Sequence, residues 1–185
     1  MSGRDRNKRI KLNNHGFSLL ELLIVIAIIA IVTVVTIFGI NALSKGNAKK
    51  MNKNLYSAIS ELKTSTMSKS GDWKITIGKV GKEFVVTTYQ NDIVRETFKC
   101  SASRVSMTYT NDGGDGTTYN LADDTMTIVF SREDGSCKSV KYGSTELNNP
   151  GASSPALSGV FTVKSSGTEY KSELWYATGR VTTRN

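Results

Sequence analysis

The stretch NNHGFSLLELLIVIAIIAIVTVVTIFGI, residues 13–40, decides how the chain is organised. It contains one carboxylate, Glu21, at the start of an otherwise apolar run, and the nineteen residues 22–40 carry no charge. About 20 apolar residues are enough for a helix to cross the hydrocarbon core of a bilayer. The length therefore predicts a membrane span, and the feature that needs an explanation is the glutamate at one end of it.

Three kinds of N-terminal segment combine a basic stretch with an apolar run. A cleaved secretory signal has a shorter apolar core, about 7–15 residues, and then a small-residue cleavage site, which residues 39–42 match poorly. A lipoprotein signal needs a cysteine at that point, and the sequence has none there. A plain signal anchor fits the length but gives no role to Glu21 or to the Gly16-Phe17 step.

At these residues the sequence resembles the type IV pilin and pseudopilin family. The family's signature is a short basic leader ending in glycine, then Phe-(Ser/Thr)-Leu-x-Glu and an unbroken apolar helix. Here it reads Gly16, Phe17, Ser18, Leu19, Leu20, Glu21, followed by LLIVIAIIAIV. The resemblance implies that a prepilin peptidase cuts between Gly16 and Phe17 and then methylates the new amine of Phe17. It also implies that Glu21 pairs with the terminal amine of a neighbouring subunit when the filament assembles.

Physical chemistry favours the same role for Glu21. A charged side chain inside a membrane helix is costly and needs a partner once it is removed from water. A stack of identical helices supplies a terminal amine at a fixed offset, which satisfies the carboxylate. The alternative, a glutamate that merely lies at the level of the lipid headgroups, predicts no role in assembly.

The chain is basic overall, with a net charge of +8. Half of this charge lies in residues 1–16, so the rest is only mildly basic and does not by itself support nucleic-acid binding. Beyond the apolar run, Lys45, Lys49, Lys50 and Lys53 follow closely. The positive-inside rule therefore favours a cytoplasmic N-terminus only narrowly, and the family resemblance is what implies this orientation.

A second helical pattern follows the apolar run. Apolar residues recur at steps of three and four at Ala48, Met51, Leu55, Ile59 and Leu62, which is one face of a helix. We expect one helix from about residue 17 to about residue 67, with a bend or an end at residues 44–47. Its first half is apolar all round and spans the membrane, and its amphipathic second half packs on a globular body.

Beyond residue 72 the pattern changes to short runs rich in β-branched and aromatic residues, separated by Gly, Asn, Asp and Ser. Alternation with period two predicts an antiparallel sheet. The runs are KEFVVTTYQ, IVRETFK, RVSMTYT, TMTIVFS, KSVKY, GVFTVKS and SELWYATGRV. The expected fold class is α+β, a long N-terminal helix on an antiparallel β-sheet domain. The segment NNPGASSP, residues 148–155, is expected to be a long exposed loop.

Together these observations divide the chain into four parts. Residues 1–16 are a leader that is removed, 17–43 a transmembrane and filament-core helix, 44–68 an amphipathic helix on the body, and 69–185 an extracytoplasmic β-rich domain. Residues 127–136 resemble a strand–turn–strand segment of minor pseudopilins, and ATGRV, residues 177–181, resembles their closing hairpin. These two matches favour a minor pilin over a major one.

The two cysteines, Cys100 and Cys137, are far apart in the sequence and form no CxxC pattern. If the body lies outside the cytoplasm, a disulfide between them is the favoured use of the pair. The alternative is two buried cysteines that are not joined.

Catalysis and cofactors are not expected. The sequence contains no GxSxG, HExxH or P-loop pattern, and its one histidine, His15, lies in the leader. Asp112 and Asp115 lie in a glycine-rich loop where some pseudopilins bind calcium, but their spacing is not that of an EF-hand. We expect a solvated turn there, and no metal site.

Two functions from different classes remain. The first is a structural subunit of a type IV pilus or pseudopilus, anchored in the membrane and then displayed at the cell surface. Its expected partners are the prepilin peptidase, the inner-membrane assembly platform and other pilin subunits contacted through the N-terminal helix. The second is a pilin-like binding module for DNA uptake or adhesion, because Lys164, Lys171, Arg180 and Arg184 are interleaved with aromatic residues, as in single-stranded DNA binding. A strand with one face in the core and a charged, solvent-exposed opposite face also explains that cluster.

Overall fold

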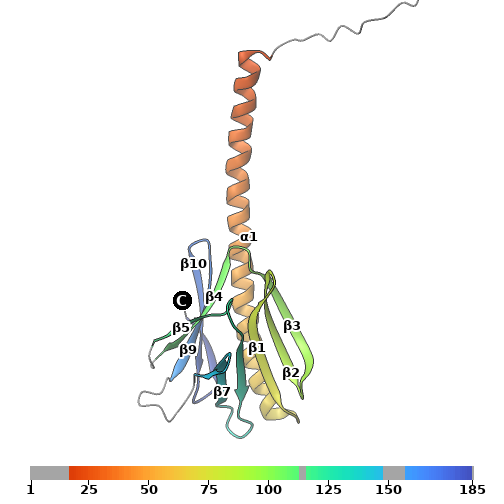
Figure 1. Ribbon diagram of the computed structural model, residues 1–185, viewed down its shortest axis with the longest axis vertical. Coiled ribbons are helices and arrows are strands. Elements are labelled where there is room, and N and C mark those ends of the chain that lie inside the picture. Colours follow the sequence, from red (N-terminus) through yellow and green to blue (C-terminus); the bar gives the residue numbers. More distant parts are fainter. Residues whose placement is uncertain (1–16, 113–115, 148–156, 185) are drawn as a thin grey trace, which may run out of the picture. The chain divides into compact units, whose positions relative to one another are not determined.

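A computed structural model describes residues 17–112, 116–147 and 157–184 (Figure 1). The chain forms two compact units, Met1–Gly39 and Ile40–Asn185. One helix, α1 (Leu19–Ser68), begins in the first unit and continues into the second. Two antiparallel sheets complete the second unit, so the predicted α+β class is confirmed.

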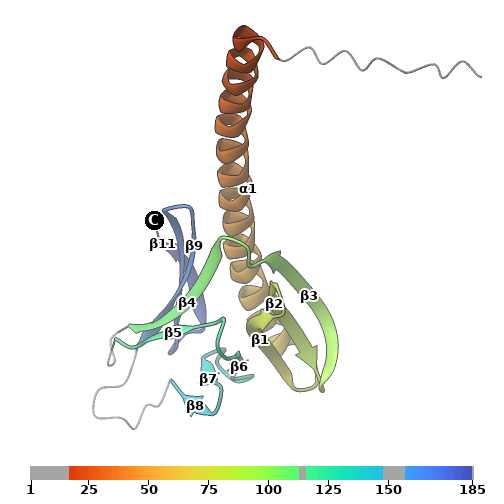
Figure 2. The ribbon, with the colours of Figure 1, turned by 45° about the horizontal axis from the view of Figure 1, so that its top comes forward.

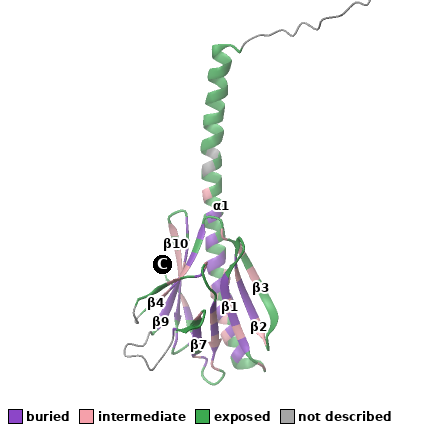
Figure 3. Ribbon diagram, in the orientation of Figure 1, coloured by how far each residue is buried: buried purple, intermediate pink, exposed green. Residues whose placement is uncertain are grey.

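The predicted helix is confirmed to within two residues at each end. Residues 44–47 are helical throughout, so the helix does not end there. The predicted apolar face is buried over its whole length, with exposed fractions of 0–1% at Ala48, Met51, Leu55, Ile59 and Leu62. In Figure 3 this part of α1 shows buried residues, whereas the described residues 19–39 are exposed.

Within the described residues, the strands form a six-stranded and a five-stranded sheet, and every pairing is antiparallel. The six-stranded sheet has the order β3-β2-β1-β6-β7-β8. Its strands are β1 (Trp73–Val80), β2 (Glu83–Gln90), β3 (Ile93–Ser101), β6 (Met126–Phe130), β7 (Cys137–Tyr142) and β8 (Thr145–Glu146).

The five-stranded sheet has the order β11-β10-β9-β4-β5. Its strands are β4 (Val105–Asp112), β5 (Thr118–Asn120), β9 (Ser158–Ser165), β10 (Thr168–Trp175) and β11 (Arg180–Arg184). Residues 127–136 comprise most of β6 and the turn to β7, and residues 177–181 comprise part of the β10–β11 turn and the start of β11. The loop expected at residues 148–155 lies outside the described residues.

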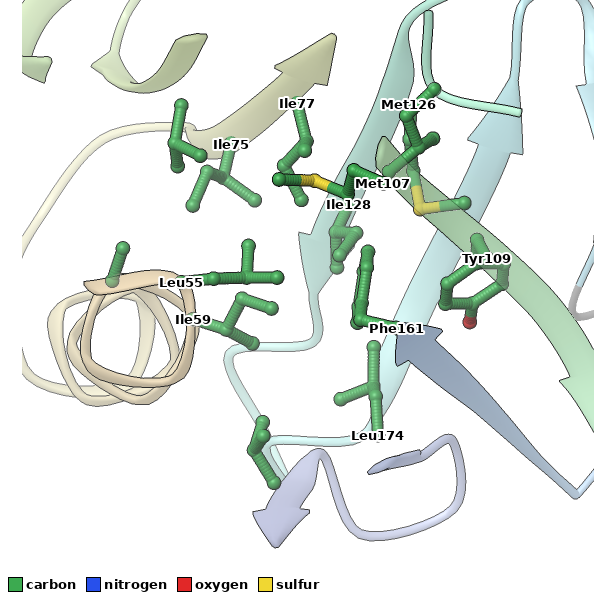
Figure 4. Close-up of a cluster of buried hydrophobic side chains, with 14 of the residues drawn as sticks. Leu55, Ile59, Ile75, Ile77, Met107, Tyr109, Met126, Ile128, Phe161 and Leu174 are labelled. Atoms are coloured by element: carbon green, nitrogen blue, oxygen red, sulfur yellow. The ribbon is translucent and has the colours of Figure 1, made fainter. Parts of the chain in front are cut away.

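The second half of α1 packs on both sheets (Figure 4). Leu55 and Ile59 face a cluster that contains Ile77 of the six-stranded sheet and Leu174 of the five-stranded sheet. The period-two alternation predicted for β4 and β6 is confirmed, because every second side chain of each strand is buried in this core. Burial of this apolar surface is the main stabilising term of the second unit.

One central strand, β1, was not predicted from the sequence. β1 lies between β2 and β6, and its side chains alternate between buried and half-buried from Trp73 to Ile77. That alternation is visible in WKITI, but lysine and threonine on the other face make the run look polar. The short edge strands β5 and β8 were also not predicted.

Candidate processing and assembly site

The first turn of α1 is closed by a capping box. The Ser18 N–H donates to Glu21 Oε2 at 3.0 Å, and the Leu20 N–H donates to Ser18 Oγ at 3.3 Å. The Leu22 N–H donates to the Ser18 carbonyl at 3.1 Å, which makes Ser18 the N-cap residue. Two of the backbone donors that a helix start leaves unpaired are thus satisfied by side chains. The carboxylate of Glu21 also lies at the positive end of the helix dipole.

The expected cleavage point directly precedes this cap. Gly16 lies outside the described residues, whereas Phe17 is 85% exposed and precedes the helix. The capping box was not predicted, although Ser18-Leu-Leu-Glu21 matches its S/T-x-x-E pattern. Glu21 therefore has an intramolecular contact in the single chain, in addition to the intermolecular role that the resemblance implies.

Residues 19–39 present apolar side chains to every side. Among the large apolar residues described there, exposed fractions run from 48% at Ile24 to 83% at Leu19. The two hydroxyls in this run bond to the helix itself, Thr33 Oγ1 to the Ile29 carbonyl at 2.7 Å and Thr36 Oγ1 to the Val32 carbonyl at 2.8 Å. These bonds remove the cost of a free hydroxyl in an apolar environment. The helix is long and apolar enough to cross a membrane.

Comparison with known protein families points to the same N-terminal segment. Residues 11–39 match the family model of the prokaryotic N-terminal methylation motif, which is the signature of type IV pilins and pseudopilins. The motif supports a type IV pilin-like subunit that is anchored in a membrane, and the family that it marks is structural. Searches of curated proteins and of solved structures found no match to the chain.

The expected disulfide is not formed in the structure, and the strand order gives the reason. Cys100 is on β3 and Cys137 on β7, with β2, β1 and β6 between them. Neighbouring strands lie about 4.8 Å apart, and four such spacings separate the two cysteines. A disulfide needs Cα atoms within about 7 Å of each other, so this pair is too far apart. Cys100 Sγ instead lies 3.7 Å from the carbonyl oxygen of Asn47 on α1. Burial raises the pKa of the Cys137 thiol to about 12.

The basic residues considered for DNA binding are mostly paired with carboxylates. Lys164 and Lys171 each lie 3.1 Å from Glu169, and Arg184 lies 3.3 Å from Asp112. Arg180 is exposed at the start of β11. This ion pairing lowers the positive potential that a nucleic acid would need.

The aromatic residues of this region divide between surface and core. Trp175 is 41% exposed, whereas Tyr176 is buried, and its hydroxyl donates to Asn111 Oδ1 at 2.7 Å and lies 2.6 Å from the Tyr109 hydroxyl. Burial raises the pKa values of both tyrosines. Tyr176 therefore stabilises the core and offers no stacking surface for a base.

The aspartates considered for calcium do not converge in the described part of the chain. Asp112 ends β4 and pairs with Arg184, and Asp115 lies outside the described residues. No group of three metal-ligating side chains is found among the residues that the structure describes.

Proposed function

We propose that the chain is a structural subunit of a type IV pilus or pseudopilus, made as a membrane-held precursor and present in the filament as a minor subunit. A peptidase removes residues 1–16, methylates Phe17, and leaves Glu21 to pair with the amine of a neighbouring subunit. The observation that supports this most strongly is the continuity of the methylation motif with a helix that is apolar and exposed on all sides.

This exposed surface needs an environment that the chain does not supply itself. Soluble monomers rarely expose contiguous apolar patches larger than a few hundred Å². A bilayer covers such a helix before assembly, and the helices of neighbouring subunits cover it afterwards. Both environments exclude water, so an uncompensated carboxylate at Glu21 is costly in each.

The capping box makes the test of Glu21 sharper, because the residue has a helix-capping role and a proposed charge-pairing role. Glu21→Gln keeps a side-chain oxygen that accepts from the Ser18 N–H but removes the charge. Glu21→Ala removes both the cap and the charge, and Glu21→Asp keeps the charge with a shorter reach. Ser18→Ala is the matched control, because it weakens the cap by about 1 kcal/mol and leaves the charge in place.

The experiment compares processed subunit in the membrane with subunit in sheared filaments. We expect all four variants to be cut normally. Glu21→Gln and Glu21→Ala should both be depleted from filaments, Glu21→Asp should be intermediate, and Ser18→Ala should be close to the parent. Incorporation of Glu21→Gln at the level of the parent would show that the charge has no role in assembly.

The assignment as a minor subunit rests on the hairpins at residues 127–136 and 177–181, which resemble those of minor pseudopilins. It predicts that the protein is present in purified filaments at a small fraction of the amount of the principal subunit. Quantitative mass spectrometry of sheared filaments measures this ratio directly. A binding module for DNA or adhesion is less well supported, because three of its four candidate cations contact carboxylates.

A further inference from the structure

We infer that the end of the globular unit nearest Asn41 docks on anionic phospholipid headgroups while the subunit is held in the membrane. This inference rests on the membrane anchoring in the proposed function. It concerns six exposed cations, which we call the basic collar: Lys45, Lys49, Lys50, Lys79, Lys82 and Arg104.

The collar is built from three segments that meet at one level of α1. Arg104, in the β3–β4 turn, donates from Nη1 to Asn41 Oδ1 at 3.2 Å. Ser166, in the β9–β10 turn, donates to the same oxygen at 3.4 Å. The Ala102 N–H donates to the carbonyl of Lys82 at 2.9 Å, which places the β1–β2 turn beside the β3–β4 turn. Figures 1 and 2 show these turns at one end of the globular unit.

The carboxylates at this end do not neutralise the collar. Glu83 lies 3.9 Å from Lys99, and Glu169 lies 3.1 Å from both Lys164 and Lys171. Residues 22–60 contain no carboxylate. Within the described part of the chain, none of the six collar cations forms an ion pair.

The opposite end of the unit has a different charge pattern. Its turns mix both signs, and Lys74 there forms an ion pair with Asp92. Glu133 and Asp134 lie in the β6–β7 turn beside Arg132. Cations and carboxylates are therefore mixed in the turns at the opposite end, whereas none of the six collar cations forms an ion pair within the described residues.

The collar begins where the apolar run ends. Ile40 is the last residue of that run, and Asn41 is the next residue along the helix. At 1.5 Å per residue, Asn41 to Lys50 covers about 14 Å. The headgroup region of each leaflet is about 5–7 Å thick, and charges act over a further Debye length of about 8–10 Å. The collar cations therefore lie within reach of the headgroups.

A lipid surface suits the collar better than a nucleic acid does. The collar segments offer no exposed tryptophan for base stacking, since Trp175 lies at the other end of β10. Headgroup binding also accounts for the lysines that follow the apolar run, which the positive-inside rule does not predict. Each Lys or Arg near an anionic surface adds a similar increment of attraction, so the effect of the collar grows with its number of cations.

The test uses the full chain in lipid nanodiscs, either phosphatidylcholine alone or an equimolar mixture with phosphatidylglycerol. Hydrogen exchange is measured at the backbone amides of residues 101–104. The collar variant is Lys49→Gln with Lys82→Gln. The matched control is Lys138→Gln with Arg180→Gln, which removes the same charge from exposed positions at the opposite end.

We expect exchange in the parent to be slower in the anionic discs than in the neutral ones, and high salt should remove the difference. The collar variant should lose this protection by roughly five-fold per cation removed, and the control variant should keep it. Equal exchange in the two lipids, or protection that survives in the collar variant, would overturn the inference.

Two further outcomes separate this inference from its alternatives. Protection by a short DNA duplex in neutral discs, without protection by anionic lipid, overturns it in favour of nucleic acid. A parent chain that does not insert into discs at all overturns both the inference and the membrane anchoring. If the parent inserts and enters filaments normally but its hydrogen exchange does not depend on lipid charge, the headgroup-binding inference is wrong and the proposed function stands.

Discussion

The two halves of α1 have the same secondary structure and opposite surroundings. In residues 44–66 the apolar side chains form one face, and that face is covered by the two sheets. In residues 19–39 apolar side chains occupy every face, and the described ones are exposed. Backbone hydrogen bonding stabilises both halves in the same way, so the difference lies in what covers the side chains.

In the proposed function, this difference lets one helix serve both the fold of the subunit and its assembly. The amphipathic half belongs to the fold of a single chain. The all-apolar half is exposed in the single chain, and in the proposed function lipid or other subunits cover it. Substitutions in the two halves should therefore appear in different measurements, and matched pairs of substitutions test this separation.

The largest expected effect is from Leu55→Ala, because Leu55 has no exposed surface and contacts the core between the sheets. Truncating a fully buried leucine should lower the free energy of unfolding by about 2–5 kcal/mol. The matched variant Leu23→Ala should leave the unfolding of the globular unit unchanged, since Leu23 is 54% exposed. Denaturant unfolding of the full chain in detergent, followed by tryptophan fluorescence, measures both. Equal destabilisation by the two variants would show that both halves of α1 contribute to the stability of the globular unit.

A smaller effect is expected at the polar residues of the two halves. Asn52 is buried, and its Oδ1 accepts from Ser172 Oγ at 3.0 Å, which ties α1 to β10. Asn52→Ala leaves the Ser172 hydroxyl without this partner and should cost about 1–3 kcal/mol. Thr33→Val removes a hydroxyl that bonds only within its own helix, so the globular unit should keep its stability. If Asn52→Ala unfolds at the same denaturant midpoint as the parent, the Asn52–Ser172 hydrogen bond does not stabilise the fold, and the prediction is wrong.

The smallest effect concerns the β6–β7 turn, which covers the end of the amphipathic half. Arg132 in this turn donates to the carbonyl oxygens of Thr66 and Lys69, at the C-terminal end of α1. In the same turn, hydrogen bonds from the Ser136 backbone and the hydroxyls of Ser131 and Ser136 lower the pKa of Asp134 from 3.8 to about 2.

Because the folded pKa of Asp134 is lowered, its ionised form stabilises the fold above the ordinary pKa. This contribution is lost as the pH falls through about 2. Asp134→Asn should therefore be less stable than the parent at neutral pH, and the difference should vanish at the acid end. Denaturant midpoints measured across that pH range test the prediction. A difference that grows on acidification would have the wrong sign.

The sequence predicted the elements that depend on local patterning. The buried face of α1 and the alternation in β4 and β6 follow directly from residue periodicity, which tertiary packing then respects. The helix persists through Ser44-Lys45-Gly46-Asn47 because flanking helical residues on both sides support it. The capping box is also local, because a serine followed three residues later by a glutamate matches its S/T-x-x-E pattern.

Strand order and side-chain pairing were beyond the reach of local patterning. The disulfide prediction failed because Cys100 and Cys137 belong to strands that are not neighbours, and spacing along the chain carries no information about sheet order. The basic cluster was overestimated because carboxylates pair with it. Asp112 reaches Arg184 from a distant strand, whereas Glu169 lies two residues from Lys171 on the same strand, β10. The missing disulfide and the Asp112–Arg184 pair concern residues distant in the sequence, whereas the pairs of Glu169 with Lys164 and Lys171 are local and could have been read from the sequence.

The most direct test of the central claim is the N-terminus of the mature protein. Intact-mass and fragment spectra of the subunit from its native membrane should show a chain that begins at Phe17 and carries one methyl group on that amine. Replacing Gly16 by a bulky residue should leave the full-length form in the membrane. A mature chain that begins at another residue, or an unmodified Phe17 amine in assembled filaments, would contradict the account.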